Sequence, residues 1–199
     1  GPITHAAIFD GEQYDARVLP GYDTPEKLSA PELNNEFNGE ILPTCGAEIY
    51  QREDLALLPI KAYTWEGVTG ESEEAYGTVV IKQEFAQGKP MTVRPGETLV
   101  VDFGQNCAAV PDFVFKAKEG TVLTCTVSEL LNDGNGAKSR GMDGPEGSPH
   151  RLNLRIPDLG MYLTYTFAGT EKPETYRPSH TFFRAYAPSP SHPLPKTWR

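Results

Sequence analysis

The sequence lacks the features that mark several large functional classes. Its 199 residues carry 18 Lys and Arg against 27 Asp and Glu, so it has no excess of positive charge for neutralising nucleic-acid phosphates. It has no run of about 18 or more apolar residues, the length that spans a bilayer. No basic-then-apolar leader follows Gly1 and Pro2. We therefore expect a protein that neither binds nucleic acid nor spans a membrane.

Cysteine is also scarce. Cys45, Cys107 and Cys125 have no CxxC spacing and are too few for a disulfide scaffold. Cys125 lies within residues 121–127, where apolar and polar side chains alternate as in a half-buried strand. We expect the cysteines to be small core residues rather than reactive thiols.

Alternation of apolar and polar residues dominates the middle and end of the chain, and helical periodicity is nearly absent. Turns rich in Gly and Pro separate the alternating segments, which is typical of an antiparallel sandwich or jelly roll. We predict an all-β, antiparallel β-sandwich with little helix, formed as one module by residues 1–183. The predicted strands are 78–85, 98–103, 112–118, 121–127, 151–156 and 161–167, and the predicted helical turns lie in 25–30 and 52–58.

Two segments interrupt this pattern. Residues 132–150 form a polar stretch of the length that often carries function, and residues 31–59 combine asparagines with the acidic pair Glu53 and Asp54. Loops that are distant in sequence converge at one end of a sandwich, so these segments and residues 106–111 can meet there.

Residues 96–106, Gly-Glu-Thr-Leu-Val-Val-Asp-Phe-Gly-Gln-Asn, resemble the β-sandwich region that precedes the catalytic domain in bacterial α-L-rhamnosidases of glycoside hydrolase family 78. The resemblance continues at Gly-Thr-Val-Leu (120–123), Ser-Glu-Leu-Leu (128–131), Arg-Gly-Met-Asp-Gly-Pro-Glu-Gly-Ser (140–148) and Gly-Glu-Gln-Tyr-Asp-Ala-Arg (11–17). It covers roughly residues 3–183. Several blocks in the right order are far more specific than one.

In that family, sandwich domains precede an α-helical barrel that carries the catalytic carboxylates, and some sandwiches bind rhamnose with a calcium ion. The resemblance therefore implies a non-catalytic carbohydrate-binding module, with L-rhamnose or a rhamnose-containing glycan as its ligand. It also implies a catalytic domain of a parent enzyme as a partner, and a secreted or periplasmic location. Two alternatives stay open: a structural spacer that orients a catalytic domain, and a fragment of an active α-L-rhamnosidase.

The resemblance ends at Phe183. Residues 184–199 contain no acidic residue and are rich in proline, a composition that cannot form a central strand. We hypothesise that this tail is not the native end of the domain and results from an altered reading frame or a truncation.

The resemblance assigns calcium and rhamnose contacts to the turn after residues 98–103 and to an acidic or amide pair in an earlier loop. In this sequence the contacts fall on Asp54, Asn106 and the carbonyl of Pro111, with Glu53 as a reserve ligand. Carboxylate, amide and carbonyl oxygens are the ligands that calcium takes. The competing interpretation is that Asn106 only satisfies the backbone of its own turn.

A second group of oxygen-bearing side chains lies in the 132–150 loop: Asp133, Asn135, Asp143 and Glu146. Its start looks like an EF-hand, but the twelfth position from Asp133 is Gly144 rather than Glu, so the segment is either a turn or a structural calcium site. Trp65 is interpreted either as a sugar-stacking ring or as a core residue. We predict no catalytic residue, because the histidines lack the spacing of a zinc site or a triad: His5, His150, His180 and His192.

Overall fold

The computed structural model describes residues 1–7, 11–21, 36, 38–43, 45–47, 50–86, 89–136, 143–150 and 162–179. Its strands are β1 (Ile3–Ala7), β2 (Gly11–Asp15), β3 (Lys61–Thr69), β4 (Thr78–Glu84), β5 (Thr98–Asp102), β6 (Phe113–Phe115), β7 (Val122–Thr126), β8 (Tyr162–Thr166) and β9 (Glu174–Tyr176). The helical segments of this part are two short 3-10 turns, η1 (Ala16–Gly21) and η3 (Glu53–Leu55). No helix among the described residues is long and apolar enough to cross a membrane. The predicted all-β class with little helix is confirmed.

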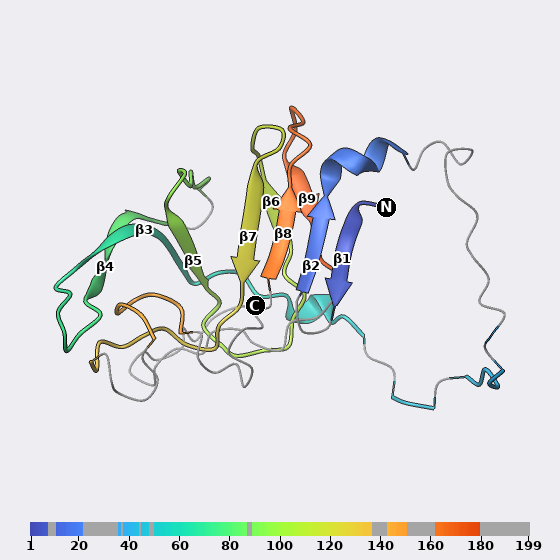
Figure 1. Ribbon diagram of the computed structural model, residues 1–199, viewed down its shortest axis with the longest axis horizontal. Coiled ribbons are helices and arrows are strands. Elements are labelled where there is room, and N and C mark those ends of the chain that lie inside the picture. The colour runs from blue at the N-terminus through green and yellow to red at the C-terminus, as the bar shows by residue number, and fades with distance from the viewer. Residues whose placement is uncertain are drawn as a thin grey trace.

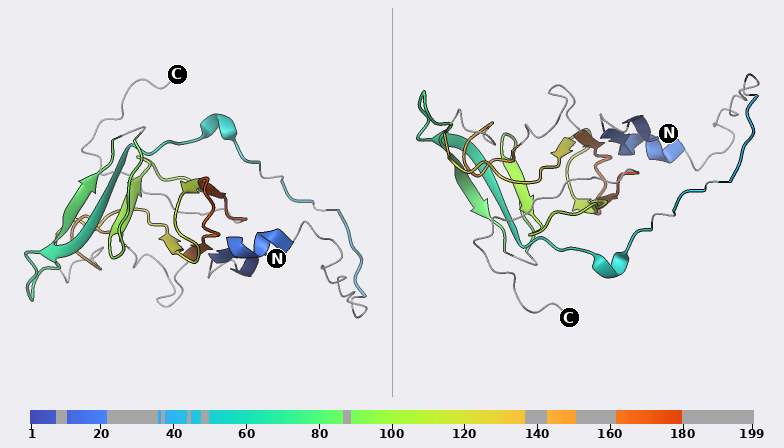
Figure 2. Two further views of the ribbon diagram at one scale, coloured as in Figure 1. Left: turned by 90° about the horizontal axis from the view of Figure 1, so that it is seen from above. Right: turned by 90° about the horizontal axis from the view of Figure 1, so that it is seen from below.

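The strands form three sheets, with the orders β1-β2-β8-β7, β4-β3-β5 and β6-β9. Seen from above, the β6-β9 pair faces the four-stranded sheet, and the β4-β3-β5 sheet stands beside them (Figures 1 and 2). The pairing is antiparallel except between β2 and β8, which run parallel. This one pair differs from the predicted antiparallel arrangement. Because β2 and β8 are far apart in sequence, no tight turn dictates their relative direction.

The main core fills the space between the four-stranded sheet and the β6-β9 pair. Leu163, Tyr165 and Phe167 alternate inward along β8 and just beyond it, and each is less than 5% exposed. The ring of Tyr165 stacks on Tyr14 with centroids 5.4 Å apart and meets Phe167 edge-on at 5.0 Å. The facing layer supplies three more rings: Phe113, Phe115 and Tyr176. Two sheets that share an aromatic core in this way form a β-sandwich.

A second, smaller core belongs to the β4-β3-β5 sheet. It consists of Tyr63, Val79 and Val100, one from each strand, with Trp65 and Leu131 packed against them. Leu131 directly precedes the polar 132–150 segment, and its apolar contact attaches the start of that segment to the three-stranded sheet.

A buried carboxylate joins β2 to β9, the last of the described strands. Glu12 of β2 is 1% exposed and accepts a hydrogen bond of 2.8 Å from the Tyr176 hydroxyl. It also accepts hydrogen bonds from the backbone N–H of Ser179, at 3.0 Å, and from the Ser179 hydroxyl. Glu12 thereby holds β9 and the segment that follows it against β2.

The sequence predicts five of these strands well, because β4, β5, β6, β7 and β8 lie within the predicted segments. The turn predicted within 52–58 is η3. The sequence misses β3, because Ala62, Tyr63 and Thr64 are buried in succession and do not alternate. It also misses the exposed β1, the polar β2 and the three-residue β9. The expected strand 151–156, the expected helix 25–30 and the tail 184–199 lie outside the described residues.

The cysteines only partly meet the expectation of core positions. Cys125 packs against the main core, and burial raises the pKa of its thiol to about 12, which makes it unreactive. Cys107 is half-buried, and burial raises its pKa as well. Cys45 is exposed, so the expectation was wrong for this residue. Figure 1 shows the reason: the described residues around it run clear of the sheets.

Candidate functional site

The loop that contains Asn106 begins with a tight turn at the end of β5. The side chain of Asp102 accepts a hydrogen bond of 2.7 Å from the backbone N–H of Gly104, whose φ of 76° suits a glycine. Burial raises the pKa of Asp102, and the bond from Gly104 and the nearby charge of Lys61 oppose that rise. The turn brings Asn106 to an exposed position and Pro111 to a half-buried one ahead of β6.

The acidic pair predicted to face this loop lies in η3. Asp54 is held by Arg52 through two hydrogen bonds, of 2.8 and 2.6 Å, with both side chains more than 60% exposed. These hydrogen bonds lower the pKa of Asp54, so its carboxylate is ionised at neutral pH. Glu53 is also exposed. Any cation that binds Asp54 must therefore compete with the Arg52 guanidinium.

Arg177, a residue that sequence reasoning missed, connects the two loops. Its guanidinium donates a hydrogen bond of 2.7 Å to Asp112, next to Pro111, and one of 3.5 Å to Gln51, next to Arg52. Arg177 directly follows β9, and β9 pairs with β6 so that Tyr176 lies opposite Phe113. The signal that would have revealed Arg177 was the short strand β9, which was itself not predicted.

The oxygen donors predicted for calcium have the right chemistry, since a carboxylate, an amide and a backbone carbonyl suit a hard cation. Among the described residues, however, no three His, Cys, Asp or Glu side chains lie close enough together to hold a metal ion. Calcium at this position would thus depend on the neutral oxygens of Asn106 and Pro111 in addition to Asp54.

Trp65 lies on β3 at the second core, away from these loops. It packs against Tyr63, Val79 and Val100, and its indole nitrogen is buried without a hydrogen-bond partner among the described residues. This packing favours the core interpretation of Trp65.

The 132–150 loop is fastened by a buried amide. Asn132 is 2% exposed; its Nδ2 donates to Asp143 Oδ1 at 3.0 Å and to Ser148 Oγ at 2.9 Å. The backbone N–H of Asp143 donates back to Asn132 Oδ1 at 3.1 Å. The loop is also bound to β3, because the Tyr63 hydroxyl donates to the Gly147 carbonyl at 2.5 Å.

Of the second predicted group, Asp133 and Asn135 form a local turn. The backbone N–H of Asn135 donates to Asp133 Oδ1 at 3.1 Å, and the two side chains are hydrogen-bonded as well. Asp143 instead faces Asn132, and Glu146 lies beside Thr78, the first residue of β4, where its Oε2 accepts a hydrogen bond of 3.1 Å from Thr78 Oγ1. The described contacts of these residues are with different partners, which favours the turn interpretation for Asp133 and Asn135.

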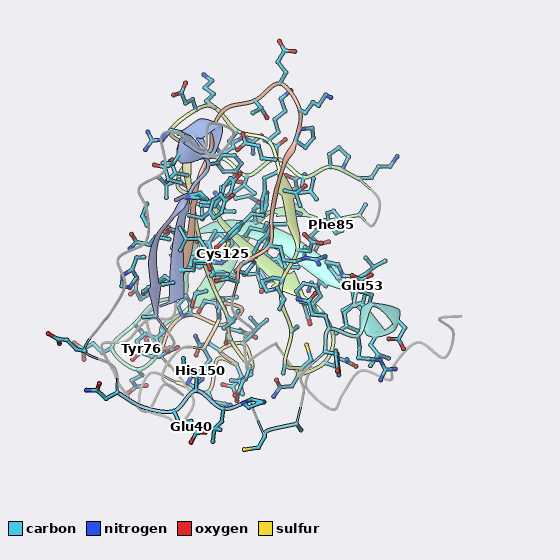
Figure 3. All side chains as sticks on the ribbon, turned by 90° about the vertical axis from the view of Figure 1, so that its right-hand side faces the viewer. Glu40, Glu53, Tyr76, Phe85, Cys125 and His150 are labelled. Carbon is cyan, nitrogen blue, oxygen red and sulfur yellow. The ribbon has the colours of Figure 1, made fainter. Side chains whose placement is uncertain are left out.

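A pocket of about 150 Å³ opens where this loop meets the β3–β4 hairpin. It is lined by Thr69, Gly70, Ala75, Tyr76, Gly77, Thr78, Gly134, Gly136 and Glu146. In Figure 3, Tyr76 and Glu53 lie on opposite sides of the molecule, so this pocket is separate from the loops around Asp54.

The chain is similar in sequence to known proteins. Residues 92–186 match the family described as bacterial alpha-L-rhamnosidase concanavalin-like domain. An alpha-L-rhamnosidase of Streptomyces avermitilis is 26% identical over 188 residues, which cover 92% of this chain. The chain is related to the bacterial α-L-rhamnosidases. No solved structure matches it.

The rhamnosidase-related chain corresponds to 14% of the length of that Streptomyces relative. The family match includes Asn106, Pro111 and Arg177, together with the whole 132–150 loop. It begins after Asp54 and Trp65, so the acidic pair of η3 comes from outside the matched segment.

Proposed function

We propose that this chain is a non-catalytic carbohydrate-binding module of an α-L-rhamnosidase-like protein, and that it binds L-rhamnose or a rhamnose-containing glycan. The relationship to rhamnosidases supports the choice of sugar. The observation that carries the proposal is the junction of the two loops at Arg177, whose guanidinium contacts Asp112 and Gln51. The junction gathers charged and amide groups on exposed loops, and such groups form directional hydrogen bonds with sugar hydroxyls.

Calcium is part of the proposal. When bound, the ion would supply charge-assisted contacts to two neighbouring sugar hydroxyls, which helps because a monosaccharide has little apolar area to bury. Asp54, Asn106 and the Pro111 carbonyl would hold it, with Glu53 in reserve. Asp54 would then give up its hydrogen bonds with Arg52 and coordinate the ion instead.

Calorimetry of the chain with L-rhamnose, with and without calcium, tests this proposal. We expect Asp54→Ala and Asn106→Ala to weaken rhamnose binding in calcium by about tenfold or more, equivalent to about 1.4 kcal/mol. Arg52→Gln should strengthen calcium binding, because it removes the competing cation. Asp133→Ala is the matched control and should leave the calcium-dependent binding of rhamnose nearly intact, because its carboxylate belongs to a separate turn. Rhamnose binding that is unchanged in excess chelator and in both alanine variants would refute the site.

A structural spacer is the second candidate, and the Glu12 contacts favour it. Glu12 ties the segment after β9 to β2, and a fixed exit for the chain would orient a domain that follows. The two candidates differ in a direct way, because a spacer requires no sugar binding by the isolated chain.

A further inference from the structure

The pocket between the β3–β4 hairpin and the 132–150 loop has the composition of a sugar site. Figures 1 and 2 show the described parts of this loop beside the hairpin, remote from the β6-β9 pair. The pocket volume of about 150 Å³ exceeds the roughly 30 Å³ that one water molecule takes in the liquid. It is well below the roughly 300–1,000 Å³ of sites for drug-sized ligands. The space therefore suits a single small ring.

Glu146 lies at the edge of this pocket, with its backbone fixed by hydrogen bonds and its side chain exposed. Its backbone N–H donates to the Gly77 carbonyl at 2.8 Å, and its carbonyl accepts from the backbone N–H of Val79 at 3.0 Å. Thr78 Oγ1 fixes the carboxylate through Oε2 at 3.1 Å. Within the described residues, Oε1 accepts no hydrogen bond. A carboxylate oxygen that is positioned but unused is an acceptor ready for ligand hydroxyls.

Glycine residues in the pocket wall leave its main chain accessible to a ligand. A Cβ at Gly134 would lie 3.2 Å from Glu146 Oε2, and the φ values of Gly134 and Gly136, 75° and 98°, are strained for other residues. Glycine at such positions lets a ligand approach the main chain closely. Tyr76, which is half-buried, adds an aromatic ring to the lining. Aromatic rings pack against the C–H face of a sugar, and Figure 3 shows Tyr76 at this edge of the molecule.

The charge of the pocket narrows the class of ligand. Glu146 is the one charged side chain among the described residues of the lining, and it disfavours an anion. The described residues bring no second and third acidic side chain to it, so it is not assembled for a metal ion. A neutral ring that carries hydroxyl groups can form hydrogen bonds with the carboxylate and the backbone groups and can pack against the tyrosine.

We propose that this pocket binds one neutral pyranose unit of a glycan, with Glu146 accepting hydrogen bonds from its hydroxyls and Tyr76 covering one face of the ring. The site is distinct from the loops around Asp54 and is a second point of attachment to a glycan. Two weak sites on one module raise the overall affinity for a chain of sugars by multivalency.

Nuclear magnetic resonance of the isotope-labelled chain tests the proposal. The probes are L-rhamnose and D-galactose as neutral pyranoses and D-glucuronate as an acidic one. We expect the neutral sugars to shift the backbone amides of Gly77, Thr78, Gly134 and Gly136, with a Kd of about 1–10 mM. Glucuronate should bind several-fold more weakly, because its carboxylate is repelled by Glu146.

Variants decide whether Glu146 and Tyr76 are the contacts. Glu146→Gln keeps the shape of the side chain and should weaken binding of the neutral sugars by about tenfold. Tyr76→Ala should weaken binding to a similar extent, and Tyr76→Phe should have a smaller effect. Glu73→Gln is the matched control, since Glu73 lies in the same hairpin outside the lining. Absence of shifts at the four amides with both neutral sugars would overturn the proposal. Shifts that persist unaltered in Glu146→Gln and Tyr76→Ala would also overturn it. Shifts confined to the Asn106 loop and lost in Asp54→Ala would support the first site and overturn this one.

Discussion

Single carboxylates hold the ends of this sandwich together. Glu174, at the start of β9, accepts hydrogen bonds from the backbone N–H groups of Ala168, Gly169 and Thr170 at 3.0, 2.9 and 3.2 Å. It also accepts a bond of 2.9 Å from the Tyr165 hydroxyl in the main core. One side chain thus stabilises the turn after β8 and joins it to β9.

Glu174 gives the fold a stability that depends on pH. Burial alone would raise the pKa of this carboxyl, but the backbone and tyrosine donors together lower it below the ordinary value of 4.5. Because the folded-state pKa is depressed, this stabilisation is fully present above pH 4.5 and is lost as the pH falls through the lowered value. We expect Glu174→Gln to lower the free energy of unfolding by about 1 kcal/mol at pH 7, and by much less at about pH 3.

Urea unfolding at the two pH values measures this difference. Glu171→Gln, in the same exposed turn, is the control and should have little effect at either pH. An equal loss at pH 7 and at low pH in Glu174→Gln would contradict the role of its charge.

At the scale of elements, Glu12 connects strands that are more than 160 residues apart. Hydrogen bonds from Tyr176 and Ser179 reach this carboxylate at the centre of the four-stranded sheet. The parallel pairing of β2 with β8 places β2 in the interior of that sheet, although its sequence, Gly-Glu-Gln-Tyr-Asp, is polar. Glu12 explains how a polar strand is accommodated there.

Glu12→Gln should therefore destabilise the chain. An amide has only one acceptor oxygen, so it can keep both Ser179 hydrogen bonds only by turning its NH2 group toward the Tyr176 hydroxyl, which then loses its acceptor. We expect the free energy of unfolding to fall by about 1–3 kcal/mol, as measured by urea unfolding at pH 7. Glu73→Gln, on the exposed hairpin, serves as the control. A Glu12→Gln variant as stable as that control would show that the contact is dispensable.

At the scale of the whole molecule, the chain corresponds to 14% of the length of its Streptomyces relative. We expect the pure chain not to turn over an aryl α-L-rhamnoside, because we assign it a binding role and not a catalytic one. The measurement compares the rate at which the aryl group is released in the presence of the chain with the rate in buffer alone. Turnover that is abolished by substituting one of its carboxylates would identify the chain as a hydrolase fragment.

The sequence by itself determined the strand-rich class, the five alternating strands and the relationship to rhamnosidases. These follow from local patterns, because the inward residues of β8 alternate and several motif blocks occur in order. It did not reveal β3, because Ala62, Tyr63 and Thr64 are buried in succession and the rest of the strand is exposed, so the strand shows no alternation.

Only the tertiary structure decided which distant groups meet. Arg177 joins Asp112 to Gln51 because β6 and β9 pair, and the Arg52 guanidinium holds Asp54. Glu146 reaches the β3–β4 hairpin through backbone hydrogen bonds to Gly77 and Val79, which no sequence spacing encodes. Pairings of this kind depend on how the sheets stack, and stacking is set by long-range burial of apolar surface rather than by neighbours along the chain.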